Sequence, residues 1–413
     1  MNIIKVPQLA WYEPKEFALS LPDEWQVEVK NMTGYNRPPL NPDEIKAAIN
    51  APIGIPPIRD FAKGKKDVVI LFDDMARVTR AGEIVPSILE ELAAAGIPDR
   101  SIRFVMALGC HGARDRRDFA KKLGEEVLAR FPVYNHNPFG NCTYVGTTTT
   151  FGTKVYVNEE VMKCDFKIAI GSVVPHPLNG FGGGGKIILP GITSFETTKY
   201  NHMMIRTTRE KSQSIAGMGI FDNDPAHLDS EEAATLAGLD VVINCIVNMW
   251  GETVAIFVGA LKPAYAAAIQ EAKTNNLTPK VEGKDIVIAN TFAKVNEAWI
   301  GLPIAYSAVK PKGDVVLIAN SPEGQVTHYL IGPFGRTSWG PQVRKPPVPK
   351  HINRLIVYTE YPDLASRAYF GESRNVLYLC KWDDVLQALQ EFHGKGSTVA
   401  VYPNAEIQYC VQQ

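Results

Sequence analysis

The chain has 413 residues, 45% of them hydrophobic and 21% charged, which is the composition of an ordinary globular protein. At roughly 100–200 residues per domain, this length predicts two or three domains. The 43 basic and 44 acidic residues give a formal net charge of -1, and no apolar run reaches the roughly 18 residues of a membrane span. We therefore expect neither nucleic acid nor a membrane as a partner.

Six cysteines are scattered along the chain without a CxxC pair, and the first residues lack the apolar core of a signal peptide. The cysteine pattern indicates neither a structural zinc site nor a disulfide framework. We expect a reducing, cytoplasmic location.

Strands and helices alternate along the first half of the chain. Apolar runs typical of buried strands, and helical apolar spacing after the first two of them, predict strands over 67–72, 102–108 and 166–170 and helices over 84–95 and 118–130. Extended structure is expected over 144–157 and a short helix over 194–202. This order predicts an α/β fold with a mainly parallel sheet covered by helices. Ligands bind such sheets at the carboxyl ends of strands, here after Phe72 and Leu108.

A polar stretch, 278–284, follows a helix expected over 263–273 and marks a domain boundary. We expect a cofactor-binding and catalytic domain over 1–274 and a second α/β domain over 275–413, whose last residues return to the first domain. The active site is expected in the cleft between them. Apolar and helical patterns in the second domain predict strands 285–289, 314–318 and 356–359, helices 296–309 and 382–392, and a candidate lid loop over 334–350.

A glycine-rich segment over 171–191 is the densest motif of the chain. Gly180 to Lys186 has the GxxxxGK spacing of a phosphate-binding loop and follows a strand. However, Ile187 stands where a magnesium-binding hydroxyl belongs, and Pro190 interrupts the helix that such a loop requires. What remains is a lysine beside glycines, which allow the backbone to come close to another group. The alternative is a flexible glycine-rich linker.

Three of the eight histidines, His111, His176 and His202, lie just after predicted strands or at a short helix end. Any one alone is ordinarily a hydrogen-bonded structural residue, but three near a glycine-flanked lysine suggest catalysis. Asp74 and Arg77 follow another strand. Asp73 and Asp74 suit a magnesium ion or a ribose, and Arg77 suits a phosphate through its bidentate guanidinium. The alternative is a helix N-cap and a surface ion pair.

The order and spacing of these residues resemble the nickel-dependent lactate racemase family. The resemblance covers most of the first 265 residues and is much weaker beyond them. It is carried by three segments, Asp73-Asp74-Met75-Ala76-Arg77, Gly109-Cys110-His111, and the stretch with Pro175-His176, Gly180-Phe181-Gly182-Gly183, Lys186, Pro190-Gly191 and His202.

The resemblance implies a nickel pincer nucleotide, a pyridinium mononucleotide whose ring carbon and two sulfur arms bind nickel. By this comparison Lys186 carries the cofactor through a thioamide and His202 is the nickel ligand. His111 and His176 are the acid/base catalysts. Cofactor contacts fall on Asp74, Arg77, Gly182 and Gly183. The family also depends on cofactor-maturation proteins as partners.

The chemistry of these residue types is compatible with racemisation of a small 2-hydroxy acid. The Cα proton beside a carboxylate is very weakly acidic, so hydride transfer through a 2-keto acid is the easier route. Each enantiomer needs a base, and two histidines with pKa values of about 6.5 suit both roles. A neutral imidazole also suits nickel.

The sequence departs from lactate racemases in the second domain. The family presents a Gln and, three residues on, a Lys to the substrate, and the matching region 292–302 has no such pair. An altered pocket suits another 2-hydroxy acid, with Lys294 and Trp299 as candidate substrate contacts, unless Trp299 is a core residue. The alternatives are a pyridoxal-phosphate-type racemase that uses Lys186, and a non-catalytic nucleotide-binding protein.

Overall fold

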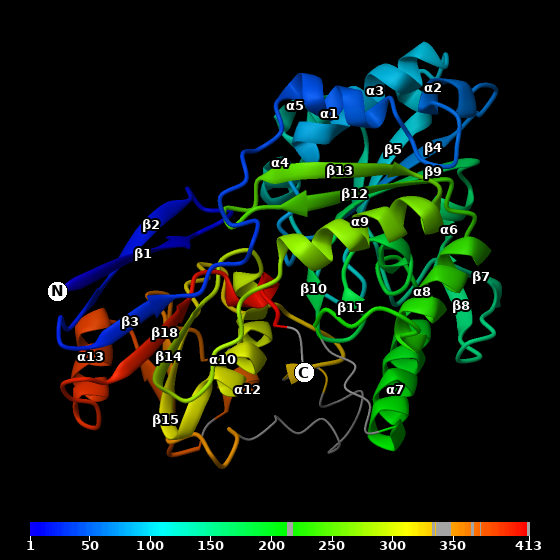
Figure 1. Cartoon of the computed structure of the whole chain (residues 1–413). Coiled ribbons are helices and arrows are strands. Elements are labelled where there is room, and N and C mark those ends of the chain that lie inside the picture. Colours follow the sequence, from blue (N-terminus) through cyan, green and yellow to red (C-terminus); the bar gives the residue numbers. More distant parts are fainter. Residues whose placement is uncertain (213–217, 333–334, 336–347, 365–366, 372, 411–413) are drawn as a thin grey trace. The chain divides into compact units, whose positions relative to one another are not determined.

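The computed structural model describes residues 1–212, 218–332, 335, 348–364, 367–371 and 373–410. The chain divides into two compact units. The central unit is Arg37–Thr274, and the terminal unit combines Met1–Asn36 with Asn275–Gln413. Each unit is built on a mainly parallel sheet with helices packed against it (Figure 1), so the α/β fold class predicted from the sequence is confirmed.

The first 36 residues do not belong to the unit that the sequence analysis expected. Strand β3 (Gln26–Val29) pairs in parallel with β18 (Thr398–Tyr402), at the edge of the sheet of the terminal unit. A short edge strand in a proline-rich segment has no periodicity that reveals its partner, because pairing is decided by the sheet it joins. The break between Thr274 and Asn275 lies shortly before the polar stretch 278–284. Near the other end, Tyr409 bridges to Leu277 within the terminal unit.

The sheet of the central unit has six strands in the order β13-β12-β9-β4-β5-β6. Only β13 runs antiparallel to its neighbour. The strands are β4 (Val68–Asp73), β5 (Ile102–Ala107), β6 (Val133–Asn135), β9 (Phe166–Ser172), β12 (Val241–Val247) and β13 (Thr253–Gly259). An antiparallel hairpin of β7 (Cys142–Thr147) and β8 (Lys154–Asn158) accounts for the extended structure expected over 144–157.

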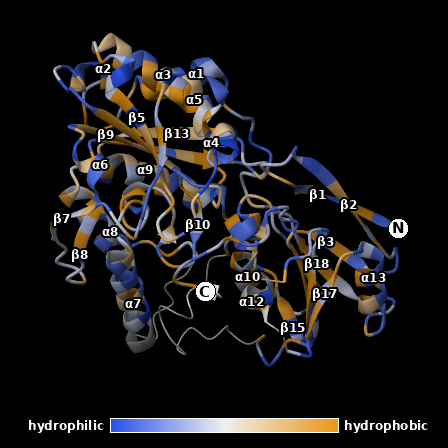
Figure 2. Ribbon diagram, turned by 180° about the vertical axis from the view of Figure 1, so that it is seen from behind, coloured by the Kyte–Doolittle hydropathy of each residue, from blue (hydrophilic) through white to orange (hydrophobic). Residues whose placement is uncertain are grey.

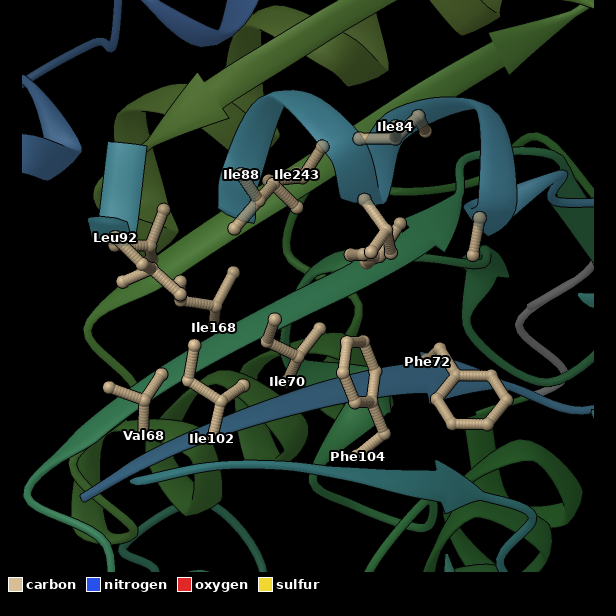
Figure 3. Close-up of a cluster of buried hydrophobic side chains, with 14 of the residues drawn as sticks. Val68, Ile70, Phe72, Ile84, Ile88, Leu92, Ile102, Phe104, Ile168 and Ile243 are labelled. Carbon is tan, nitrogen blue, oxygen red and sulfur yellow. The ribbon is translucent and has the colours of Figure 1, made fainter. Parts of the chain in front are cut away.

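Both faces of this sheet are apolar and covered. Figure 3 shows alternate residues of the strands, such as Ile70 and Ile168, meeting Ile84, Ile88 and Leu92 of a helix. In Figure 2 strands β5 and β9 are correspondingly hydrophobic. One face carries α1 (Pro42–Ile49), α2 (Ile58–Phe61), α3 (Ala81–Ala94), α4 (Arg116–Leu123) and α5 (Glu125–Arg130). The other carries α6 (Glu159–Met162), the 3₁₀ helix η2 (Gly184–Ile187), α8 (Pro225–Leu236) and α9 (Leu261–Asn275).

Two helices of the central unit differ from their predicted extents. The helix expected over 118–130 is two helices, α4 and α5, because Gly124 between them has φ of 84°, which ends a right-handed helix. The helix expected over 194–202 is α7 (Phe195–Ser212), which is longer than its apolar pattern indicated. A further 3₁₀ turn, η1 (Asp99–Ser101), precedes β5.

The terminal unit has a six-stranded parallel sheet in the order β17-β16-β15-β14-β18-β3. Its other strands are β14 (Lys284–Asn290), β15 (Val309–Ile318), β16 (Arg354–Tyr358) and β17 (Val376–Leu379). The hairpin of β1 (Asn2–Gln8) and β2 (Lys15–Leu21) and helix α13 (Trp382–Gln390) cover one face. The other face carries η3 (Val295–Gly301), α10 (Leu302–Ala308), α12 (Arg367–Phe370) and η5 (Ala405–Ile407).

The helix expected over 296–309 is therefore a 3₁₀ segment followed by a short α-helix, with a non-helical residue at Glu297. Most of the candidate lid loop, 334–350, lies outside the described residues. Within the described part of the chain, no helix combines the length and apolar character needed to cross a bilayer.

A buried histidine makes the stability of the central unit depend on pH. His136 Nε2 lies 2.9 Å from the carbonyl oxygen of Thr193, and Asn158 Nδ2 lies 3.2 Å from its Nδ1. Burial lowers the pKa of His136 to about 4. The unfolded chain takes up this proton near pH 6.5, so the stability contribution is complete above pH 6.5 and is lost as the pH falls toward 4.

We expect this loss to be about 3 kcal/mol between pH 7 and pH 4. Urea unfolding of the wild type and of His136→Gln, followed at several pH values, measures it. Other groups titrate in the same range, so the difference between the two curves isolates His136. Stability curves that stay parallel would rule out a buried neutral imidazole.

Candidate active site

Several candidate residues of the central unit follow parallel strands whose carboxyl ends lie on the same side of its sheet. Strands β5 and β6 lie on one side of β4, whereas β9 and β12 lie on the other, so the loops after β4 and β9 diverge. Such a switch point is where open α/β sheets bind ligands. Asp74 and Arg77 follow β4, His111 follows β5, and the glycine segment with His176 follows β9.

His111 and Asp74 are in direct contact. The imidazole Nδ1 lies 2.6 Å from Asp74 Oδ2, and both side chains are buried. Burial would raise the pKa of Asp74, but His111, Arg114 and Arg77 outweigh it and hold this pKa well below its ordinary value. The carboxylate is therefore ionised at neutral pH and holds the Nδ1 proton of the ring. Nε2 is left as the nitrogen that can accept a proton.

His176 has the opposite arrangement. It lies on β10 (Pro175–His176), which forms a short antiparallel pair with β11 (Gly180–Phe181). The backbone N–H of Leu178 donates to His176 Nδ1 at 3.1 Å. A neutral ring with Nδ1 as acceptor carries its proton on Nε2. The two histidines therefore differ in the nitrogen that holds the proton, as assigned from their hydrogen bonds.

Lys186 lies on η2, directly after the glycines, and is anchored to the same hairpin. Its Nζ donates to Asn179 Oδ1 at 3.1 Å. Asn179 is itself buried and donates through Nδ2 to the carbonyl of Ala226 and to Ser230 Oγ, at 3.1 and 3.3 Å. The lysine amine is thus held by a side chain that helix α8 fixes.

The glycines around Lys186 are required by close packing. A Cβ on Gly182 would lie 3.1 Å from the carbonyl oxygen of Ser172, and one on Gly183 would lie 2.7 Å from Val173. At Gly184, where φ is +53°, it would enter the Tyr265 ring at 2.5 Å. These contacts are incompatible with a flexible linker. A long helix, as a phosphate-binding loop needs, does not follow, because η2 has four residues.

His202 lies on α7, and its Nδ1 is 3.2 Å from Asn201 Oδ1. Asn201 donates through Nδ2 to Asp229 Oδ2 at 2.7 Å. The carboxylate of Asp229 is fully buried on α8 and also accepts hydrogen bonds from Thr148 and Thr153. A ring nitrogen fixed through such a chain leaves Nε2 with its lone pair, which is how metal-binding histidines are oriented.

Helix α7 is also connected to the loop that carries His111. The side chain of Cys110 is hydrogen-bonded to Thr198, one turn before His202 on the helix, and burial raises the pKa of the Cys110 thiol to about 12. Thr198 further bonds Thr193 Oγ1 at 3.1 Å. Among the candidate residues from Asp74 to His202, Asp74 and His111 are in direct contact.

Lys294 and Trp299 belong to the terminal unit. Lys294 is buried after β14, and its N–H, like that of Phe292, donates to Glu406 Oε1. Burial raises the pKa of Glu406 to about 7, and Lys294 partly opposes this rise. Trp299 is partly buried against the core of the terminal unit.

Several supporting residues were not found from the sequence. Lys122, Asn179 and Asp229 are buried and hydrogen-bonded to the site segments. Only Lys122 left a signal, because it falls on the apolar face of its helix with Phe119 and Leu123. Among the described residues, no group of three or more His, Cys, Asp or Glu side chains is placed to hold a metal ion, so His202 stands as a single candidate ligand.

Comparisons with known proteins agree on one family. Residues 12–214 match the model of the lactate racemase N-terminal domain. The chain is 27% identical over 336 residues to the lactate racemase of Thermoanaerobacterium thermosaccharolyticum, covering 78% of this chain and 76% of that one. It is 24% identical to the lactate racemase of Lactiplantibacillus plantarum, covering 72% of each.

Two solved structures share the fold. The lactate racemase apoprotein of T. thermosaccharolyticum superposes with a TM-score of 0.75 at 22% identity, with both chains fully covered. A protein from Thermotoga maritima gives a TM-score of 0.67 at 18% identity, covering 91% of this chain and all of that one.

Proposed function

Because the chain belongs to the lactate racemase family of isomerases, we propose that it inverts the Cα of a 2-hydroxy acid. The chemistry that a bound nickel pincer nucleotide supplies is reversible acceptance of a hydride from Cα, through a 2-keto acid. The observation that carries the proposal is the contact of His111 with the ionised Asp74 at the switch point of the sheet. It provides a base where a ligand is expected.

The residues around the glycine segment fit this cofactor. Lys186 offers a primary amine for a thioamide, Arg77 a guanidinium for phosphate, and His202 an imidazole nitrogen for nickel. The buried side chain of Asn244 beside the glycine segment also fits a bound nucleotide. Its Oδ1 accepts from the N–H of Gly184 at 3.0 Å, but its buried Nδ2 has no hydrogen-bond partner among the described residues. A buried donor without a partner beside this loop suits an acceptor atom of a bound nucleotide.

His111 would take the hydroxyl proton of the substrate on Nε2. The resulting imidazolium is stabilised by the Asp74 carboxylate at its other nitrogen, as in other carboxylate–histidine pairs. His176 holds its proton on Nε2 and donates a hydrogen bond to the substrate oxygen. To act as a base for the other enantiomer, it moves this proton to Nδ1 and gives up the bond from Leu178.

Lys294 and Trp299 are our candidates for substrate contacts in the terminal unit. The ammonium group suits the substrate carboxylate, and the indole suits an acid larger than lactate. The substrate is a small molecule, and cofactor-maturation proteins are the partners that would supply Lys186 with its group. The six free cysteines fit the cytoplasmic location that we propose.

The experiment is a panel of chiral 2-hydroxy acids with enzyme matured by the cofactor's biosynthetic proteins. We expect racemisation of at least one acid, dependent on nickel, without entry of solvent deuterium at Cα. Deuterium at Cα would contradict hydride transfer. A borohydride-trapped Schiff base at Lys186 without nickel would support a pyridoxal-phosphate enzyme. Nucleotide binding without turnover of any acid, unchanged by His111→Ala and His176→Ala, would indicate a binding protein.

A further inference from the structure

Lys122 is a buried cation beneath the candidate site. It lies on α4, and its side chain is 0% exposed. Its Nζ donates to Asp73 Oδ1 at 2.8 Å, to the carbonyl of Arg77 at 2.8 Å and to the carbonyl of Thr79 at 3.1 Å. An ammonium has three N–H donors, so these three acceptors match its full capacity. A buried charge is retained in a fold only with such partners.

The three acceptors enclose one segment of the chain. Asp73 is the last residue of β4, and residues 77 and 79 lie in the loop that follows it. Asp74 lies between Asp73 and residue 77. Asp74 Oδ1 also accepts from the N–H of Ala76 at 3.1 Å, which folds the loop back on itself. The ammonium therefore binds both ends of the loop whose carboxylate contacts His111.

Asp73, the anionic partner, extends this anchor to the neighbouring strand. Its Oδ2 accepts from Thr79 Oγ1 at 2.5 Å and from the N–H of Ser172, at the end of β9, at 3.4 Å. At Gly171 an added Cβ would lie 3.6 Å from Asp73 Oδ2 and 3.9 Å from the Cα of Gly183. The ion pair thus lies under the segments that follow both β4 and β9.

We propose that Lys122 is a positioning residue: paired with Asp73, its ammonium fixes residues 74–79 and so aims the Asp74 carboxylate at His111. Burial lowers the pKa of Lys122, and Asp73 and Asp74 oppose this change. The expected effect of Lys122 on kcat rests on the proposed function, whereas its effect on the geometry of the Asp74–His111 pair does not.

The test compares Lys122→Met with Lys167→Met. Lys167 is a matched control, since it is also a buried lysine of the central unit and donates to a backbone carbonyl, that of Cys164 at 2.8 Å. Because Lys122→Met leaves Asp73 buried without its cation, the double variant Asp73→Asn/Lys122→Met is made as well. The double variant removes both charges, so no unpaired charge is left buried and we expect the protein to fold.

The first readout uses the protein without cofactor, labelled with ¹⁵N-histidine. We expect the Nδ1 resonance of His111 to shift in the double variant and to stay in place in Lys167→Met. Backbone amides of residues 76 and 77 should exchange faster with solvent only in the variants that lack Lys122. A purely structural role would lower the unfolding temperature without moving a single histidine resonance.

The second readout is turnover by the matured enzyme. We expect kcat to fall by about 10²-fold in the double variant, as for a catalytic group displaced by roughly 1 Å, with KM within about twofold. A double variant that keeps both the wild-type His111 resonance and the wild-type kcat would overturn the proposal. If the His111 resonance shifts in the double variant but the matured wild-type protein racemises no acid, the positioning role of Lys122 is upheld and the proposed function is rejected.

Discussion

The Lys186→Arg variant should gain no mass when it is matured with the cofactor's biosynthetic proteins, and it should not racemise above the uncatalysed background. Arginine keeps the positive charge and the reach to Asn179 Oδ1, which Lys186 contacts at 3.1 Å. A guanidinium remains protonated at neutral pH, so it lacks the nucleophilic amine that a thioamide requires. Intact-protein and peptide mass spectrometry measure attachment, and chiral chromatography measures turnover.

The fold should tolerate this change. Asn179 keeps both bonds of its Nδ2, to Ala226 and Ser230, whatever residue stands at position 186. Lys199→Met on α7 serves as the control, because its ammonium is partly exposed and its ion pair with Glu196 has an N–O distance of 3.8 Å. The control should match the wild type in mass gain and rate. Equal mass gain in Lys186→Arg would exclude this lysine as the attachment point.

The His111→Ala variant should lose about 10²- to 10⁴-fold in kcat, the range typical of a general base. Racemisation has an equilibrium constant of one, so kcat/KM must fall equally for both enantiomers. Added imidazole should restore part of the rate, because the truncated side chain leaves room for it beside Asp74. Rates measured from each pure enantiomer, with and without imidazole, check both statements.

Asp74→Asn separates the role of the carboxylate from that of the ring. An amide of the same shape can still contact His111 Nδ1, but it cannot stabilise the imidazolium by charge. We expect a loss in kcat as large as that of His111→Ala, without rescue by imidazole. His351→Ala changes an exposed histidine of the terminal unit and should leave the rate unchanged. Full activity of Asp74→Asn would remove Asp74 from the mechanism.

The proximity of two candidate residues, Asp74 and His111, could be predicted from the sequence, because chain order determines which strands they follow. Apolar runs identified β4, β5 and β9, and neighbouring parallel strands end at one edge. Residues that follow such strands, Asp74 and His111 among them, must come close together. No pattern could show that their side chains would meet at 2.6 Å, since that distance depends on loop conformation.

The contacts that support the candidate site could not be predicted from the sequence for another reason. Asp229 on α8 and Asn201 on α7 are 28 residues apart, and only tertiary packing joins them. Periodicity describes which face of a helix is buried and says nothing of its partner. Gly124 was a readable signal for the end of a helix, and the prediction of one helix over 118–130 overlooked it.

The placement of strand β3 has a consequence for the order of folding. Gln408 Nε2 donates to the carbonyl of Lys30, a residue 378 positions earlier in the chain. During synthesis, the first 36 residues leave the ribosome long before β18 exists to receive them, whereas the strands of the central unit are complete by residue 259. The central unit can therefore form around its own core before β3 has a partner, so the nascent chain carries β3 as an unpaired strand until Thr398–Tyr402 has been synthesised.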